Sequence, residues 1–193
     1  MEFLKPKAGD TILDAGCGTG IFTSHILASG ANVVGLDLSF PMVDRAARKF
    51  RSFSLPFSPI EGNMTALPFK DESFDKAVSI TALEFIEDGA SAVNELFRIT
   101  RSGGIVIAAT LNSRSSWASR RRKEAESKET IFSKAVFRSP LEMLALTTVL
   151  GIVKTAVHFQ KDTDPRTAIK TEQAGLRQGL QTGAFVAACW QKP

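Results

Sequence analysis

Short apolar runs alternate along the chain with segments whose apolar residues recur at helical spacing. This alternation is typical of a parallel sheet that is buried between two layers of helices. The pattern therefore predicts an α/β fold with seven strands, most of them parallel, and with helices on both faces of the sheet. The strands are expected at residues 11–14, 32–37, 57–61, 76–81, 104–110, 152–159 and 183–190.

Helices are expected in the segments that connect the first five strands. Apolar residues on one face predict a helix at 21–29, which Gly30 is placed to end in a left-handed conformation, and another at 90–99. Ser39 can cap a further helix, because Pro41 follows in its first turn. Helices in these places provide the crossovers that parallel strands require.

The clearest helix start in the sequence is formed by Ser139, Pro140 and Glu142. Serine is a preferred N-cap, proline fits the first helical position, and a glutamate three residues after the cap completes a capping box. We expect this helix to continue until Gly151.

Length and composition predict one domain, 1–193, with a sizeable core, since 44% of its 193 residues are hydrophobic. Residues 112–138 are polar and basic and exceed ordinary connections of ~2 to 6 residues, so we expect a lid or substrate-binding insertion there. No apolar run approaches the ~20 residues of a membrane span, which favours a cytoplasmic protein. The net charge of +4 is too small to indicate a nucleic-acid partner. Cys17 and Cys189 lack metal-ligand spacing, so we expect reduced packing residues and no metal.

A glycine-rich loop follows the first predicted strand and precedes the first predicted helix. Gly16, Gly18 and Gly20 let the main chain turn tightly and approach a ligand, at the edge of the sheet where open α/β folds bind ligands. Asp37 ends the second strand, where a carboxylate can accept hydrogen bonds from both hydroxyls of a ribose. Together these features predict a nucleoside-containing ligand.

The spacing of the glycines distinguishes two classes of ligand. Here it is G-x-G-x-G, whereas dinucleotide folds use G-x-G-x-x-G to seat a pyrophosphate on the helix N-terminus. At this point the chain resembles the class I S-adenosylmethionine-dependent methyltransferases, whose first motif is a strand followed by Asp-x-Gly-x-Gly-x-Gly. The resemblance extends over nearly the whole chain and includes the later motifs of the family at 60–64, 67–69, 74–78 and 96–107.

The resemblance implies that S-adenosylmethionine is the cofactor, that S-adenosylhomocysteine is the product, and that the last strand is antiparallel. The first motif would line the methionine part of the cofactor, and Asp37 would hold the ribose. Leu38 and Met64 would pack on the adenine. Asn63, where the family usually has aspartate, would accept from the exocyclic amine through its amide oxygen. The implied cofactor-binding residues are Asp14, Ala15, Gly16, Cys17, Gly18, Gly20, Asp37, Leu38, Met42, Asn63, Met64 and Thr81.

Methyl transfer requires that two reactants be positioned and water excluded, and it needs neither a metal nor a nucleophilic side chain. By resemblance, residues 81–85 would face the methyl group and its acceptor. A general base would help an acceptor that must lose a proton. The sequence offers several candidates and assigns no catalytic residue among them: Glu84, Glu87, Asp88 and His158.

The most charged stretch of the sequence lies within the long insertion. One interpretation is a solvated helix face on which glutamates compensate the cations. The other is that the cations and Trp117 form part of the acceptor pocket, or dock on an anionic surface. The cations are Arg114, Arg120, Arg121, Arg122 and Lys123, and the glutamates are Glu124, Glu126 and Glu129.

The N-terminal segment departs from the resembled family, which usually has a helix before the first strand that helps to cover the cofactor. Here only about ten residues precede that strand, so the helix is apparently absent. Large bare apolar patches are uncommon on monomers. We therefore expect either a truncated start with weakened cofactor binding, or a homodimer in which the partner covers this face.

Methyl transfer to a small-molecule acceptor is the function that the sequence favours, with quinone-type or other lipid-soluble acceptors as one option. A nicotinamide-dependent oxidoreductase would also use a glycine-rich loop and Asp37, although the glycine spacing argues against it. A methyltransferase-like protein that binds the cofactor without activity is a further alternative.

Overall fold

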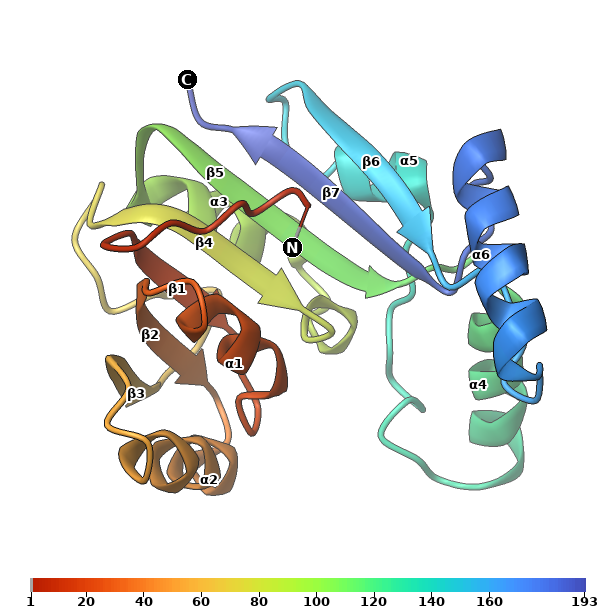
Figure 1. The fold of residues 1–193 in the computed structure, drawn as a ribbon, viewed down its shortest axis with the longest axis horizontal. Coiled ribbons are helices and arrows are strands. Elements are labelled where there is room, and N and C mark those ends of the chain that lie inside the picture. The colour runs from red at the N-terminus through yellow and green to blue at the C-terminus, as the bar shows by residue number, and fades with distance from the viewer. Residues whose placement is uncertain (1) are drawn as a thin grey trace.

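The computed structural model describes residues 2–193 and contains one seven-stranded sheet with the order β3-β2-β1-β4-β5-β7-β6 (Figure 1). The first five strands pair in parallel, and β7 runs antiparallel to both β5 and β6. The predicted α/β class, the number of strands and the antiparallel last strand are therefore confirmed. The strands are β1 (Thr11–Ala15), β2 (Asn32–Asp37), β3 (Phe57–Glu61), β4 (Phe74–Ile80), β5 (Thr100–Leu111), β6 (Gly151–Ala156) and β7 (Phe185–Gln191).

Helices cover both faces of this sheet, as the hydrophobic pattern predicts. On one face α3 and α5 pack on a core that includes Leu13, Ala77 and Trp190, whereas on the other α1 and α2 pack on Ile12 and Val78. Neighbouring residues of one strand serve opposite cores because successive side chains of a strand point to opposite faces. The helices are α1 (Ile21–Leu27), α2 (Phe40–Arg51), α3 (Gly89–Ile99), α4 (Ser116–Ser127), α5 (Pro140–Leu144) and α6 (Pro165–Gln178), with a 3₁₀ turn η1 (Leu83–Phe85).

The capping box at Ser139 is present, but the helix that it starts is much shorter than expected. The Ser139 hydroxyl accepts from the Glu142 main-chain N–H, and the Glu142 carboxylate accepts from that of Ser139. Helix α5 nevertheless ends at Leu144 and does not reach Gly151. Three β-branched residues follow in a row at 147–149, and the Thr147 hydroxyl accepts from the Val149 N–H. Both features favour turns over helix, so the predicted end was wrong.

The longest helix, α6, is absent from the expectations drawn from the sequence. Asp164 caps it by accepting from the main-chain N–H groups of Arg166 and Thr167, Pro165 occupies the first turn, and Gly179 ends it with φ 64°. These are ordinary start and stop residues, so the sequence carried the signal. Strand β6 also ends at Ala156 rather than at residue 159, because the chain turns there toward α6.

The long insertion contains a helix of its own. Ser115 caps α4 by accepting from the Ala118 N–H, and the Trp117 indole donates to the Phe159 carbonyl at 2.9 Å. The Asn112 amide donates to the carbonyls of Gln181 and Gly183. Figure 1 accordingly places α4 and α6 at the same edge of the molecule, beyond β6.

On the face that carries α1, the segment before β1 runs across the sheet. Leu4 is buried, and Phe3 packs partly buried against the same core. A cavity of about 240 Å³ lies beside them, over β4, β5, β6 and β7. Separately, no helix within residues 2–193 has the length and apolar character that crossing a bilayer requires.

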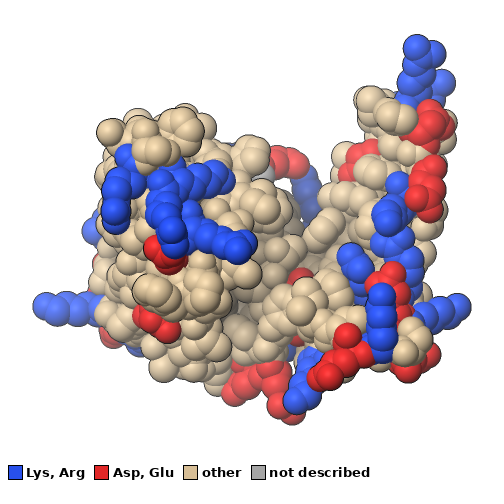
Figure 2. All heavy atoms as spheres, turned by 90° about the horizontal axis from the view of Figure 1, so that it is seen from below, with Lys and Arg blue, Asp and Glu red and all other residues tan. Residues whose placement is uncertain are grey.

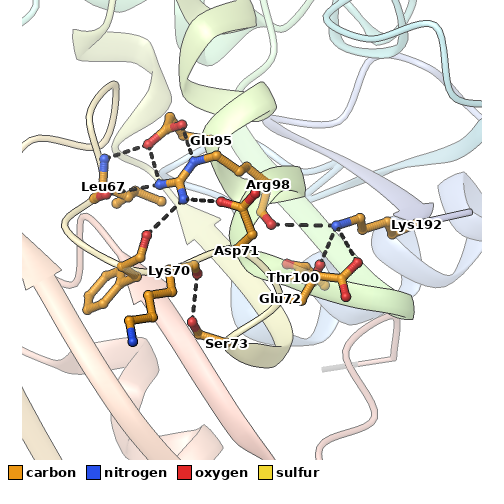
Figure 3. Close-up of polar contacts among 10 residues, drawn as sticks. Leu67, Lys70, Asp71, Glu72, Ser73, Glu95, Arg98, Thr100 and Lys192 are labelled. Carbon is orange, nitrogen blue, oxygen red and sulfur yellow. Dashed lines mark hydrogen bonds and ion pairs between the residues drawn. The ribbon is translucent and has the colours of Figure 1, made fainter.

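Arg98 fixes the loop that connects β3 to β4. Its guanidinium donates to both carboxylate oxygens of Glu95 on the same helix, at 2.7 and 2.9 Å, and to the Asp71 carboxylate at 2.7 Å (Figure 3). It also donates to the main-chain carbonyls of Leu67 and Phe69, at 3.0 and 2.8 Å. One side chain on α3 therefore holds a loop that contains no helix or strand of its own.

Replacing Arg98 by methionine should lower the free energy of unfolding by about 1–3 kcal/mol, because several charge-assisted hydrogen bonds are lost while the apolar stem is kept. Urea unfolding of the purified variant measures this change. Lys70→Met is the matched control, since Lys70 is exposed in the same loop. Equal stabilities of the two variants would show that the Arg98 contacts contribute nothing.

Candidate active site

A cavity of about 700 Å³ opens at the carboxyl ends of β1, β2 and β4. Strand β1 lies between β2 and β4, so the cavity is at the point where the strand order reverses, which is where open α/β sheets bind ligands. Seen from below, the molecule is hollowed between the side where α2 lies and the side where α4 and α6 lie (Figure 2). This volume is typical of small-molecule and cofactor sites.

The glycine-rich loop forms one wall of the cavity through Gly16, Cys17 and Gly18. The main-chain N–H groups of Gly16 and Cys17 both donate to the Leu36 carbonyl, at 2.6 and 3.0 Å. Gly16 has φ 77°, and a Cβ added there would lie 2.2 Å from the Cβ of Ala82. Only glycine therefore allows the loop to turn across the end of β2 and lie against the end of β4.

The Asp37 carboxylate lines the cavity at the end of β2. One of its oxygens accepts from the Gly18 N–H at 2.8 Å, and the other accepts from the Ser39 N–H at 2.9 Å. Each carboxylate oxygen has two lone pairs, so each can still accept one more hydrogen bond. The carboxylate is thus held in one orientation and presents two acceptor positions to a ligand.

Three of the predicted cofactor residues do not line the cavity: Asp14, Ala15 and Gly20. Asp14 is buried behind the loop and accepts from the Thr23 hydroxyl at 2.6 Å. Ala15 is fully buried in the core. Gly20 has φ 76°, and a Cβ there would lie 2.4 Å from the Phe50 ring, so this glycine serves the packing of α2 beneath the loop.

The other predicted positions, among them Leu38, Met42, Asn63 and Met64, all line the cavity. Leu38 is 73% exposed and Met42 is 39% exposed, whereas Met64 is buried. Exposed apolar side chains at a cavity rim offer a ligand surface that it can remove from water.

Asn63 also lines the cavity, but its amide oxygen is already engaged. It accepts from the main-chain N–H of Thr65 and from the Thr65 hydroxyl, both at 2.9 Å. These two donors occupy both lone pairs of the oxygen. The amide oxygen is therefore not free to accept from an adenine amine, as the resemblance implied, and the side chain offers its N–H groups instead.

Cys17 is a packing residue in this loop. Its side chain is buried, and burial is the largest of the effects that raise the pKa of its thiol, followed by the nearby charges of Asp14 and Asp37. A thiol with a raised pKa is a poor nucleophile. The structure thus agrees with the expectation of a small apolar filler.

The turn after β4 combines a strained residue with a short segment that a buried arginine holds. Thr81 lines the cavity with φ 56°, a conformation that β-branched residues rarely adopt. In the segment that follows Thr81, the carbonyls of Leu83 and Ile86 accept from Arg138, both at 2.9 Å, and that of Glu87 accepts at 3.1 Å. Arg138 is buried, and burial lowers the pKa of its guanidinium. A residue far along the chain therefore clamps η1, and sequence analysis gave no indication of it.

The four candidate bases lie in different environments. Glu84 is 2% exposed, on η1, and burial raises the pKa of its carboxyl. Glu87 and Asp88 are exposed and outside the cavity, and the Asp88 side chain caps α3. His158 follows β6 rather than lying on it, and its ring packs against Gly175 of α6. Only Glu84 is close to the site.

A cavity of about 320 Å³, called the second cavity below, adjoins the larger cavity of about 700 Å³. Both are lined by Thr81, Phe85 and Ile131. Trp117 and Arg121 of α4 line the second cavity, as one interpretation of the basic stretch proposed. The other interpretation also holds in part, since Arg121 pairs with Glu124 at 2.9 Å and Arg120 approaches it at 4.0 Å. The same helix thus combines a compensated outer surface with a wall of a cavity.

Sequence reasoning missed several residues that line the first cavity. Ile21 and Ser39 flank predicted positions, so the neighbourhood of the motifs could have indicated them. Ile131 lies in the insertion and reaches the cavity only through the fold, so no local signal could have found it. Among residues 2–193, no group of three or more His, Cys, Asp or Glu side chains could hold a metal.

Comparison with known proteins identifies the fold of the chain and a family for residues 13–108. Residues 13–108 match the model of a methyltransferase domain family. A SAM-dependent methyltransferase from Thermotoga maritima, described as a possible histamine N-methyltransferase, superposes with a TM-score of 0.74 at 22% identity, covering 98% of this chain and 84% of that one. The geranyl diphosphate C-methyltransferase of Streptomyces coelicolor A3(2) gives 0.69 at 19% identity, covering 100% and 78%.

Curated relatives are similar over about half of the chain. The malonyl-[acyl-carrier protein] O-methyltransferase of Erwinia billingiae is 40% identical over 106 residues, which is 55% of this chain and 41% of the relative. The protein of the same name from Yersinia pestis is 37% identical over 111 residues, 58% of this chain and 40% of the relative. The chain thus spans about two fifths of the length of the curated relatives that it matches.

The fold, the glycine-rich loop and the family match agree on one class, and the chain is a member of the class I S-adenosylmethionine-dependent methyltransferases. The resemblance predicted from the motifs is therefore confirmed. The nicotinamide-dependent alternative is not favoured, because the matched family and the similar structures are methyltransferases.

The stability of the protein should depend on pH through Asp14. Burial is the main cause that raises the pKa of Asp14 to about 6, so the fold favours the protonated form. The stabilisation from this group is complete below its unfolded pKa and is lost as the pH rises through about 6. Between pH 4 and pH 7 this loss amounts to roughly 2 kcal/mol.

Asp14→Asn removes this titration while leaving an amide oxygen that can accept from Thr23. The variant should gain stability relative to the natural chain as the pH rises, which urea unfolding at a series of pH values measures. Asp162→Asn, at an exposed loop position, is the control and should show no such trend. A stability difference for Asp14→Asn that is the same at every pH would contradict the argument.

Proposed function

We propose that this chain binds S-adenosylmethionine in the larger cavity and transfers its methyl group to a small-molecule acceptor in the adjoining one. The observation that carries the proposal is the orientation of Asp37. Its carboxylate is fixed by the main-chain N–H groups of Gly18 and Ser39 and lines a cavity of about 700 Å³. A ribose donates two hydroxyl protons, which matches the two acceptor positions of this carboxylate.

The chemistry of the cavity wall fits the remaining parts of that cofactor. The main chain at Gly16 and Gly18 is bare, so a polar amino-acid group can approach it closely. Leu38, Met42 and Met64 supply apolar surface for a flat base. We assign Asn63 as a donor to a ring nitrogen of the adenine, since its amide oxygen is engaged by Thr65.

S-adenosylmethionine supplies a methyl carbon that is activated by a positive sulfur, so the side chains of this protein have only to position the acceptor and exclude water. The boundary between the two cavities is formed by Thr81, Phe85 and Ile131, because these residues line both. We propose that they place the acceptor against the methyl group. Residues 112–138 would then act as the substrate-binding insertion.

The acceptor of the curated relatives is not carried over to this chain. Six of the nine residues that line the second cavity follow residue 108, beyond the part that matches the family model. The matched part supplies most of the first cavity instead. The family match therefore supports the cofactor, and for the acceptor we propose the class of small molecules.

Binding of S-adenosylhomocysteine tests the cofactor assignment directly. Isothermal titration calorimetry should detect it with the natural chain and should detect no binding of NAD. Asp37→Asn should weaken the affinity about 10- to 100-fold, because an amide cannot accept through both of its ends and a charged acceptor is lost. Thermal unfolding of the variant shows whether the fold is retained.

Glu61→Gln is the matched control for this substitution. Glu61 lies opposite Asp37 in the register of β2 and β3, is exposed and does not line the cavity. Its substitution should leave the affinity unchanged. Binding of NAD in preference to S-adenosylhomocysteine, or equal affinity in Asp37→Asn and the natural chain, would refute the proposed function.

A further inference from the structure

Four of the nine residues that line the second cavity are aromatic. Phe85, Trp117, Phe132 and Phe185 all line it, and the rings of Phe85 and Phe132 lie 5.9 Å apart with an interplanar angle of 31°. The Arg121 guanidinium lies 4.8 Å from the centre of the Phe132 ring. Rings in such arrangements favour a flat apolar ligand, which can stack against one or more of them.

One acidic group is buried in this aromatic wall. Glu84 lines the cavity although its side chain is almost wholly removed from water. One of its carboxylate oxygens accepts from the Thr110 hydroxyl at 2.9 Å. An acidic side chain is rarely buried to this degree unless it is paired or functional.

No cation within residues 2–193 pairs with Glu84 directly. Arg138 approaches from the segment before α5, but its guanidinium donates to the main-chain carbonyls of η1. Arg121 of α4 lines the same cavity and forms its ion pair with Glu124. The charge of Glu84 is therefore left without an ion-pair partner, and burial raises the pKa of its carboxyl.

A buried carboxyl with these properties is suited to one kind of acceptor. Burial makes the carboxylate a stronger base than an exposed glutamate, so it can remove a proton from a weakly acidic hydroxyl. The Glu84 carboxylate also disfavours an anionic acceptor, because two negative charges in the same apolar cavity repel each other. A neutral flat molecule with a hydroxyl group satisfies both conditions.

We infer that the acceptor is a planar aromatic hydroxyl compound and that Glu84 is the catalytic residue that accepts its proton. This inference rests on the proposed function. In the transfer, the acceptor oxygen forms a bond to the methyl carbon while the bond from that carbon to sulfur breaks, and the electron pair of the broken bond stays on sulfur. The hydroxyl proton passes to the Glu84 carboxylate, which later releases it to water.

Two naphthalene derivatives of the same shape provide the probes. 2-Naphthol carries the hydroxyl and 2-naphthoate carries a carboxylate, and the binding of each is measured by calorimetry with the protein saturated by S-adenosylhomocysteine. 2-Naphthol should bind, and 2-naphthoate should bind at least tenfold more weakly. Absence of 2-naphthol binding, or a preference for 2-naphthoate, would overturn the inference.

Transfer of labelled methyl groups from S-adenosylmethionine to 2-naphthol then tests Glu84. Glu84→Gln should lower kcat by about a hundredfold or more while 2-naphthol still binds, because an amide fills the same space but accepts no proton. Glu87→Gln is the control, since Glu87 is exposed and outside both cavities. Equal rates in the two variants would overturn the assignment of Glu84.

The pH dependence of the transfer rate is an independent test, which can be measured even if Glu84→Gln folds poorly. The rate of the natural chain should rise with pH through the pKa of Glu84. Thr110→Val removes the hydrogen bond that lowers this pKa, so the rise should move to higher pH. An unshifted profile would contradict the role of Glu84, whereas failure of S-adenosylhomocysteine to bind at all would refute the proposed function itself.

Discussion

Two main-chain hydrogen bonds to the carbonyl oxygen of Leu36 hold the glycine-rich turn that forms one wall of the larger cavity. They bring Gly16 and Cys17 across the end of β2, which places the Gly18 N–H against the Asp37 carboxylate. The same turn rests on Ala82 after β4, where there is no space for a Cβ. One short segment of backbone thus sets the relative positions of three strand ends, and the ligand-facing groups follow from it.

The two cavities are formed by different parts of the chain. The larger cavity comes mostly from strand ends and the loops directly after them, within the segment that matches the family. The smaller cavity comes mostly from α4, the segment after it and β7, and its η1 wall is held by Arg138 from far along the chain. Such a division lets one scaffold retain a cofactor while its acceptor pocket changes.

Local chemistry explains what the sequence could predict. The strands at 32–37 and 57–61 have the predicted ends, and Asp37 faces the cavity as its place at a strand end implied. Asp14 and Gly20, which the resemblance implied as cofactor residues, do not line the cavity and instead pack behind the loop, against Thr23 and Phe50 respectively. The motif alone does not distinguish a residue that contacts a ligand from one that packs behind the loop.

Long-range contacts explain what the sequence could not predict. Arg138 and Ile131 reach the site only because the segment after α4 packs against η1, and no spacing in the chain marks them. Helix α6 is a different case, since Asp164, Pro165 and Gly179 are ordinary start and stop residues that mark it in the sequence. The early end of α5 was set by the β-branched run after Ala145, which outweighed a complete capping box.

The wall that the two cavities share constrains any redesign of this protein. Thr81, Phe85 and Ile131 line both cavities, so a substitution at any of them alters the proposed cofactor site and the proposed acceptor site at once. Trp117 and Phe132 face the smaller compartment only. Variant libraries designed for new acceptors should therefore vary Trp117 and Phe132. They should leave the three shared residues unchanged, so that binding of the methyl donor is kept.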